Sequence, residues 1–208
     1  MNQFDKNYLN NIVRLLAGVD EAGRGPLAGP VVASAVVFEK DIHIDDVADS
    51  KTLSENKREA LFERITSECL SYSVSVIDHE IIDEINILNA SLLAMKQAVE
   101  SLTVKPDLVL VDGNKGFVCD IPVFPIVKGD SKSFSIGAAS IIAKVTRDRL
   151  MRKYSLDYPF YFLEKNKGYP TLQHRQAVLK FGPSPIHRRT FLKKLYANSD
   201  KYFMEVES

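Results

Sequence analysis

Short apolar runs bounded by glycine, proline or polar residues recur through the first two thirds of the chain. Runs of this length that are rich in Val, Ile and Leu favour strands over helices. At 72–76 the apolar residues alternate with serines, as in a half-buried strand. The pattern predicts strands at about 12–20, 30–39, 72–76, 108–111 and 122–127.

Other stretches repeat their apolar residues every three to four positions, which is typical of helices with one buried face. Ser54 precedes one such stretch, and Ser131 or Ser133 precedes another, where a serine oxygen can cap the free N–H groups of a first turn. The pattern predicts helices at about 54–70, 78–85, 86–102, 133–153, 171–181 and 190–196, after a polar lead-in at 1–11.

This order of elements predicts an α/β fold with a mixed sheet and helices packed on it. The 208 residues suit one domain, and the sequence contains no internal repeat or Gly/Ser linker. Strands that are separated by helices can lie parallel, and ligands then gather at their carboxyl ends.

Three of the predicted strands end in an acid beside a glycine. Asp20 and Glu21 follow the first strand, Asp112 follows a second, and Asp130 follows a third. If those ends meet at one edge of the sheet, four carboxylates converge and need a cation between them. Because no His or Cys ligand has suitable spacing, the expected metal is Mg²⁺ or Mn²⁺. A pair of such ions can activate water and stabilise the leaving oxygen of a phosphodiester.

The turn after the first acids, Gly23-Arg24-Gly25, is suited to a close approach by another molecule. The guanidinium of Arg24 offers planar donors for phosphate. The alternative is an ordinary hairpin turn with solvated acids, which the same residues also favour.

Overall charge is neutral, with 27 Lys and Arg residues against 27 Asp and Glu residues, but the charge is unevenly placed. The segment 144–196 carries thirteen basic residues and three acids, which is the footprint of a face that binds a polyanion. Lys144, Arg147, Arg188 and Arg189 are candidates to follow a nucleic-acid backbone. Tyr169, beside Lys167 and Gly168, is a candidate to stack on a sugar or base. The alternatives are a solvated helix face and a half-buried tyrosine.

The two cysteines, Cys69 and Cys119, form no CxxC pair, so we expect reduced thiols and a cytoplasmic protein. The N-terminal residues lack a signal-peptide pattern, and no apolar run reaches the length of a membrane helix, so we expect no contact with a membrane.

Longer strings of residues resemble the bacterial ribonuclease HII family almost from end to end. The matching strings are Val19-Asp-Glu-Ala-Gly-Arg-Gly-Pro-Leu-Ala-Gly-Pro-Val, Asp49-Ser-Lys, Ile85-Asn-Ile, Val111-Asp-Gly-Asn, Lys128-Gly-Asp130, Ala138-Ala-Ser-Ile-Ile-Ala-Lys-Val, Arg147-Asp, Lys167-Gly-Tyr-Pro-Thr and Ile186-His-Arg-Arg-Thr-Phe. Several such strings in one order are far more specific than any single motif.

The resemblance implies a ribonuclease H-like fold, with a mixed five-stranded sheet, flanking helices and a small C-terminal helical segment. It implies endonucleolytic cleavage of RNA in RNA–DNA hybrids, and incision beside a ribonucleotide embedded in duplex DNA, giving a 3′-hydroxyl and a 5′-phosphate. We expect residues 1–155 to form the catalytic domain and 156–208 to form a substrate-binding segment packed on it, in a monomer.

The resemblance also assigns residues by position. Asp20, Glu21, Asp112 and Asp130 match the family's catalytic, metal-binding acids. Gly23, Arg24 and Gly25 match the loop that senses the ribose 2′-hydroxyl and the scissile phosphate, and Tyr169 matches the tyrosine that packs on the sugar at the RNA–DNA junction. Lys51, Lys144 and Arg147 lie in matching strings and are expected to touch phosphates.

One position departs from the family, because Gly137 stands where alanine is more usual. A glycine there is expected to loosen one helical turn by up to about 1 kcal/mol. Asp130 as the fourth acid and the absence of a long N-terminal domain favour ribonuclease HII over the related ribonuclease HIII class.

Two other functions stay open for this sequence. One is a nuclease of the same fold that cuts branched DNA, and the other is a nucleic-acid-binding module without chemistry. The four acids weigh against a pure binder, because negative charge that faces phosphates weakens binding.

Overall fold

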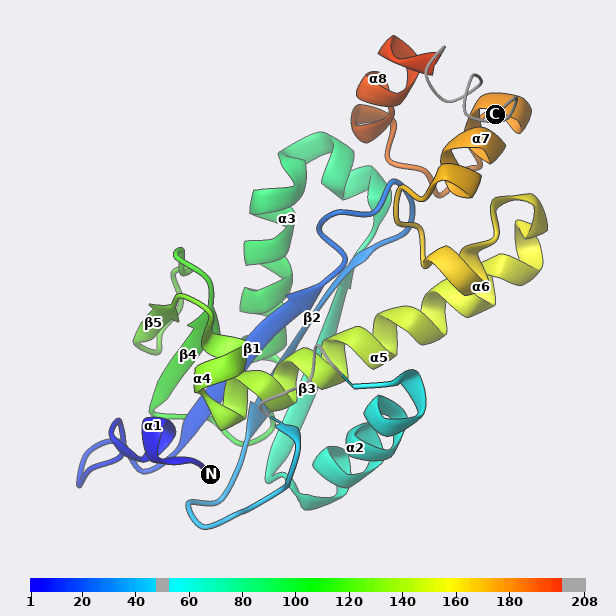
Figure 1. Cartoon of the computed structure of the whole chain (residues 1–208). Coiled ribbons are helices and arrows are strands. Elements are labelled where there is room, and N and C mark those ends of the chain that lie inside the picture. The colour runs from blue at the N-terminus through cyan, green and yellow to red at the C-terminus, as the bar shows by residue number, and fades with distance from the viewer. Residues whose placement is uncertain (48–52, 200–208) are drawn as a thin grey trace.

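The computed structural model describes residues 1–47 and 53–199. Its centre is a five-stranded sheet in the order β3-β2-β1-β4-β5 (Figure 1). The strands are β1 (Leu16–Ala22), β2 (Val31–Val37), β3 (Ser71–Ile77), β4 (Leu108–Asp112) and β5 (Val123–Ile126). β2 is antiparallel to β1 and β3, whereas β1, β4 and β5 are parallel to one another. The mixed sheet that the sequence predicts is therefore confirmed.

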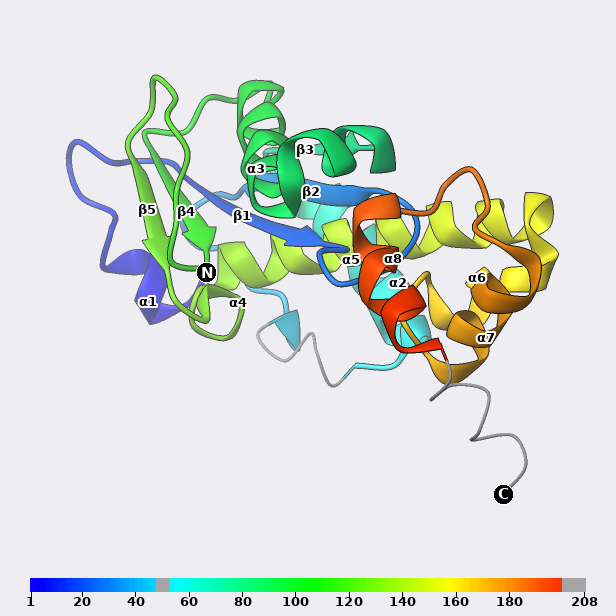
Figure 2. The same ribbon diagram turned by 90° about the horizontal axis from the view of Figure 1, so that it is seen from above.

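Helices cover both faces of the sheet. α5 (Phe134–Asp157) lies on one face and α3 (His79–Glu100) on the other, as Figure 2 shows. Alternation along β1 divides the core between these faces, because Leu16 packs on the α5 side and Ala17 and Val19 pack on the α3 side. α2 (Glu55–Glu68) packs against α5.

The short elements are α1 (Gln3–Lys6), α4 (Gly129–Lys132), a 3₁₀ turn (Pro159–Tyr161), α6 (Leu163–Asn166), α7 (Leu172–Phe181) and α8 (Arg189–Ala197). The last of these form a separate apolar cluster with Leu27, Ala28 and Met151. The C-terminal helices therefore pack on the loop after β1 and on the far end of α5. The domain boundary near residue 155 stays a prediction.

The predicted start and end of the first strand are wrong. The first strand begins at Leu16 rather than near residue 12, because Asn10 Oδ1 accepts the N–H groups of Ile12 and Val13 and holds a turn there. That strand continues to Ala22, so both acids belong to it instead of lying on a tip beyond it. The break predicted between helices at 78–85 and 86–102 is confirmed, because α3 is kinked at Asn86 (φ 67°).

β1 and α5 approach each other most closely at Gly18. A Cβ atom there would lie 2.0 Å from the carbonyl carbon of Ser135. Gly137, two residues after Ser135 on α5, faces the Val47 carbonyl oxygen, 2.9 Å from where its Cβ would be. The absence of a side chain at Gly137 therefore leaves room for the segment that contains Val47. This packing role is separate from the loosening of a helical turn that the sequence predicts.

We expect Gly18→Ala to destabilise the protein by about 3 kcal/mol or more, since the added methyl group meets backbone that cannot move aside. Chemical denaturation of the purified variant measures this. Gly116→Ala is the matched control, because its Cβ would meet only side-chain atoms, of Val123 and Pro125, with the nearest at 3.2 Å, and it should change stability by less than about 1 kcal/mol. Equal stability of the two variants would contradict the close approach.

Candidate active site

The parallel strands bring the predicted acids to one edge of the sheet. Val19 on β1 is in register with Val111 on β4, so Asp20 and Asp112 are the next residues along the two strands. Asp112 pairs in turn with Ile126 at the end of β5, from which the chain runs into α4 and Asp130. The expectation that these strand ends meet at one edge is confirmed.

Asp20 is buried, with 6% of its surface exposed. Burial, followed by repulsion from Glu21, raises the pKa of the Asp20 carboxyl well above its ordinary value. A hydrogen bond from the Ser140 side chain opposes this rise. The N–H of Glu21 donates to Asp20 Oδ1 at 2.7 Å and fixes the carboxyl group.

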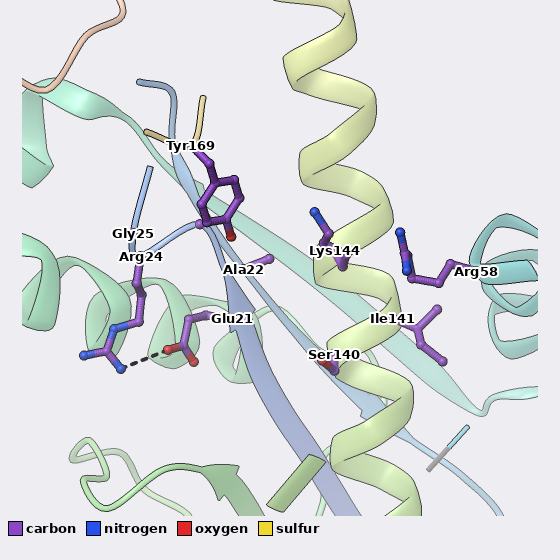
Figure 3. A pocket seen from close by; sticks show the side chains of 10 residues that line it. Glu21, Ala22, Arg24, Gly25, Arg58, Ser140, Ile141, Lys144 and Tyr169 are labelled. Carbon is purple, nitrogen blue, oxygen red and sulfur yellow. Dashed lines mark hydrogen bonds and ion pairs between the residues drawn. The ribbon is translucent and has the colours of Figure 1, made fainter. Parts of the chain in front are cut away.

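The two carboxylate oxygens of Glu21 lie in different environments. Oε1 accepts a hydrogen bond from Arg24 Nη1 at 3.2 Å, the dashed contact in Figure 3. Oε2 is buried without a hydrogen-bond partner. Burial raises the pKa of Glu21, and the positive charge of Arg24 opposes that rise. A buried carboxylate oxygen without a donor is costly unless a cation or proton reaches it.

Asp112 and Asp130 are joined through the backbone. Asp112 Oδ1 accepts the N–H of Gly129 at 2.6 Å and that of Asp130 at 3.4 Å. Asp130 itself is buried, with 4% of its surface exposed. These contacts tie the end of β4 to the start of α4.

The acids suit a hard cation, although they do not form a closed cage. Among residues 1–47 and 53–199, no three His, Cys, Asp or Glu side chains lie close enough together to hold an ion. Yet Glu21 Oε2 lacks a partner, and Asp112 acts on both Asp20 and Glu21 to raise their pKa values. Carboxylate oxygens that repel one another are the ligands that Mg²⁺ and Mn²⁺ take. The donor set therefore fits the expected metal.

A cleft of about 390 Å³ opens beside Glu21. The Gly23-Arg24-Gly25 turn and Tyr169 form one wall, while Ser140 and Lys144 of α5 and Arg58 of α2 form the other (Figure 3). Tyr169 is 39% exposed, and Lys144 Nζ lies 5.8 Å from the centre of its ring. Asp112 lies on the other side of Glu21, where both line a second, smaller hollow of about 30 Å³.

Arg147 and Arg188 are not on this surface. Both are fully buried, and their guanidinium groups donate to backbone carbonyl oxygens inside the protein. The expectation that Arg147 touches a phosphate is wrong, and so is the expectation that Arg188 follows a nucleic-acid backbone. Lys51 lies outside the described residues.

Arg58 and Ser140 line the cleft, although no sequence pattern indicates either of them. Arg58 lies on α2 in a segment where acids outnumber bases, so charge counting drew attention away from it. Only the packing of α2 against α5 brings it opposite Tyr169.

Comparisons with known proteins identify the family of the chain. The family model described as Ribonuclease HII matches residues 17–198. Ribonuclease HII of Caldicellulosiruptor saccharolyticus is 51% identical over 193 residues, covering 93% of this chain and 94% of that protein. The crystal structure of ribonuclease H2 from Pyrococcus horikoshii OT3 matches with a TM-score of 0.72 and 31% identity, over 91% of this chain and 99% of that one.

The fold alone also matches Bst-RNase HIII in complex with Mn²⁺, with a TM-score of 0.64 and 17% identity, over 92% of this chain and 72% of that one. The family model covers most of the chain, and the Caldicellulosiruptor relative is aligned over nearly the full length of both proteins. The chain belongs to the ribonuclease HII family.

Proposed function

We propose that this protein hydrolyses the RNA strand of RNA–DNA hybrids and incises duplex DNA on the 5′ side of a single embedded ribonucleotide. The observation that carries the proposal is the cleft itself, in which Glu21, a glycine-flanked turn, an aromatic ring and basic side chains share one hollow. A nuclease needs negative ligands for metal ions and positive contacts for phosphates within reach of one another.

Different residues of the cleft would contact different parts of the substrate. The Gly23-Arg24-Gly25 turn would approach the ribose 2′-hydroxyl, the group that separates RNA from DNA. Tyr169 would pack on the neighbouring sugar, since its half-exposed ring faces the cleft. Lys144 would contact the phosphate backbone, and Arg58 joins it as a further candidate.

The four acids would hold divalent cations, two of them during catalysis. Asp20 and Asp112 would hold the ions, Glu21 would supply a further ligand, and Asp130 would assist an ion or the leaving group. When bound, Mg²⁺ or Mn²⁺ would supply an activated water and neutralise the leaving oxygen, giving a 3′-hydroxyl and a 5′-phosphate. The unpartnered Glu21 Oε2 supports this assignment.

A duplex with one ribonucleotide in an otherwise DNA strand tests the proposal directly. We expect one cut, 5′ to the ribonucleotide, in Mg²⁺ or Mn²⁺, and none in EDTA. The same duplex without the 2′-hydroxyl is the matched control. Cleavage of an all-DNA branched junction in preference would support a junction nuclease, and metal-independent binding without products would support a binding module.

We infer that the protein acts as a monomer in the cytoplasm. Among the described residues both cysteines are free thiols, which supports a reducing compartment. Within that same part of the chain, no helix has the length and apolar character to span a membrane.

Arg58→Ala should weaken substrate binding more than chemistry. We expect KM to rise by about three- to tenfold with kcat within about twofold, since one phosphate contact is lost and the acids are untouched. The slope of log affinity against log salt should fall by about one. Arg64→Ala on the same helix is the control, because Arg64 pairs with Glu68 and does not line the cleft. An unchanged KM and salt slope in Arg58→Ala would remove Arg58 from the substrate path.

A further inference from the structure

Two buried arginines lie directly behind the Gly23-Arg24-Gly25 turn. Arg147 comes from α5 and Arg188 from the loop before α8, and neither exposes any surface. Together they donate seven hydrogen bonds to backbone carbonyl oxygens. We call this pair the arginine brace. The mechanism proposed above makes no use of either side chain.

Arg188 holds the turn itself. Its Nη2 donates to the Gly23 carbonyl at 2.6 Å and its Nη1 donates to the Arg24 carbonyl at 3.1 Å. In a trans peptide the C=O and the following N–H point in opposite directions. The N–H groups of Arg24 and Gly25 therefore point away from the buried guanidinium. The cation also polarises both peptide units, which strengthens those N–H groups as donors.

Arg147 packs directly against the same turn, at Gly23. A Cβ at Gly23 (φ 102°) would lie 2.1 Å from Arg147 Nε, so the turn rests on this side chain. Arg147 Nε and Arg188 Nη2 share the Pro30 carbonyl, at 2.9 Å and 3.0 Å. Arg147 also donates to the Lys167 carbonyl, and its guanidinium carbon lies 5.7 Å from the centre of the Tyr169 ring.

Two buried histidines extend this support to Tyr169. The N–H of Ser184 donates to His187 Nδ1 at 3.0 Å, so the proton of that ring is on Nε2. His187 Nε2 then donates to His174 Nε2 at 3.0 Å, which leaves His174 Nδ1–H to donate to the Tyr169 carbonyl at 2.9 Å. This direction requires both rings to be neutral, and burial lowers both pKa values, that of His187 to about 3.

Backbone hydrogen bonds also join the segments that Arg147 and Arg188 contact. Leu27 N–H donates to the Gly168 carbonyl at 2.8 Å, and Arg188 N–H donates to the Leu27 carbonyl at 2.8 Å. The turn, the Tyr169 loop and the loop before α8 are thus fixed to one another. Burial of two neighbouring cations is unfavourable, and it lowers the pKa of Arg147 to about 10 and that of Arg188 to about 9. Such a costly arrangement suits a site whose geometry must be held.

We propose that Arg188, supported by Arg147, is a positioning residue for ribose recognition: it holds the carbonyls of Gly23 and Arg24 so that the following N–H groups face the bound sugar. This inference rests on the proposed function. It makes ribose selectivity depend on a side chain that never touches the substrate.

Arg188→Lys tests the inference, because lysine keeps the charge but cannot reach all four carbonyls. The readout is the ratio of two dissociation constants in Ca²⁺, one for an all-DNA duplex and one for the same duplex with a single ribonucleotide. We expect the ratio to shrink by about five- to tenfold through loss of hydrogen bonds to the 2′-hydroxyl, with affinity for all-DNA unchanged within about twofold. Arg64→Lys, an exposed pair on α2, is the control and should keep the wild-type ratio.

The ratio separates positioning from folding, because a partly unfolded preparation loses affinity for both duplexes equally. An unchanged ratio in folded Arg188→Lys would overturn the inference and leave the proposed function standing. If the wild-type protein bound both duplexes equally and cleaved neither, the proposed function would be wrong instead. If Arg188→Lys fails to fold, Arg147→Lys provides the same comparison. Should both fail, the Nε–H protons of the wild-type brace should resist hydrogen exchange, and rapid exchange would overturn the inference.

Discussion

Asp112→Asn should reduce cleavage of the ribonucleotide-containing duplex by about a thousandfold or more in Mg²⁺ while the protein still binds it. The substitution removes one negative charge from the group that would hold the metal ions, and preorganised charge of this kind commonly supplies factors of that size. Asn Oδ1 can still accept the Gly129 N–H, as Asp112 Oδ1 does at 2.6 Å. The fold should therefore be retained.

Single-turnover cleavage and fluorescence anisotropy with the same duplex measure the two effects. Affinity should stay equal or increase, since one charge that repels phosphate is gone. Asp157→Asn, at the exposed end of α5, is the control and should cleave at the wild-type rate. Full activity of Asp112→Asn in Mg²⁺ would show that Asp112 is not a metal ligand.

Asp20→Asn should abolish cleavage and also make the metal-free protein harder to unfold. Burial, with repulsion from Glu21, raises the pKa of Asp20 in the folded protein above that in the unfolded chain. Between those two pKa values the folded protein keeps a proton that the unfolded chain has released, so wild-type stability falls as pH rises through this window. Asparagine carries no charge and avoids that loss. We expect it to add about 1–2 kcal/mol at pH 8.

Thermal unfolding in EDTA between pH 4 and pH 8 measures the difference. The difference in unfolding temperature between the variant and the wild type should increase as pH rises. Mg²⁺ should reduce this difference by stabilising only the wild type. Asp120→Asn changes an exposed carboxylate and should show no such trend. A variant less stable than the wild type at pH 8 in EDTA would contradict the buried-charge argument.

The sequence predicts the sheet well because its strands either alternate apolar and polar residues or form continuous apolar runs. Glycine, proline or polar residues mark where these strands end. Boundaries are wrong where side chains compete for backbone groups, as Asn10 does before β1. Asp107 does the same, since its Oδ2 accepts the N–H groups of Arg14 and Leu15. The Asn10 contact is local, whereas the Asp107 contact depends on tertiary placement, and hydrophobic periodicity indicates neither of them.

The arrival of the acids at one edge is predictable because each lies at the end of a strand or shortly after it, and parallel strands share an edge. The basic residues are not, because charge counting cannot tell a surface arginine from a buried one. Arg147 and Arg188 stand in the basic C-terminal segment yet donate inward, whereas Arg58 stands among acids yet lines the cleft. Only the packing of α2, α5 and the C-terminal loops decides which arginine meets water.

The hydrogen bond between Arg188 and Gly23 spans 165 residues of sequence. On a ribosome, the Gly23-Arg24-Gly25 turn emerges early, but it stays without the Arg188 side chain that holds it until nearly the whole chain has been made. Contacts of such long range form late and slow folding. A nascent chain would therefore carry its acids and its glycine turn long before it could tell RNA from DNA.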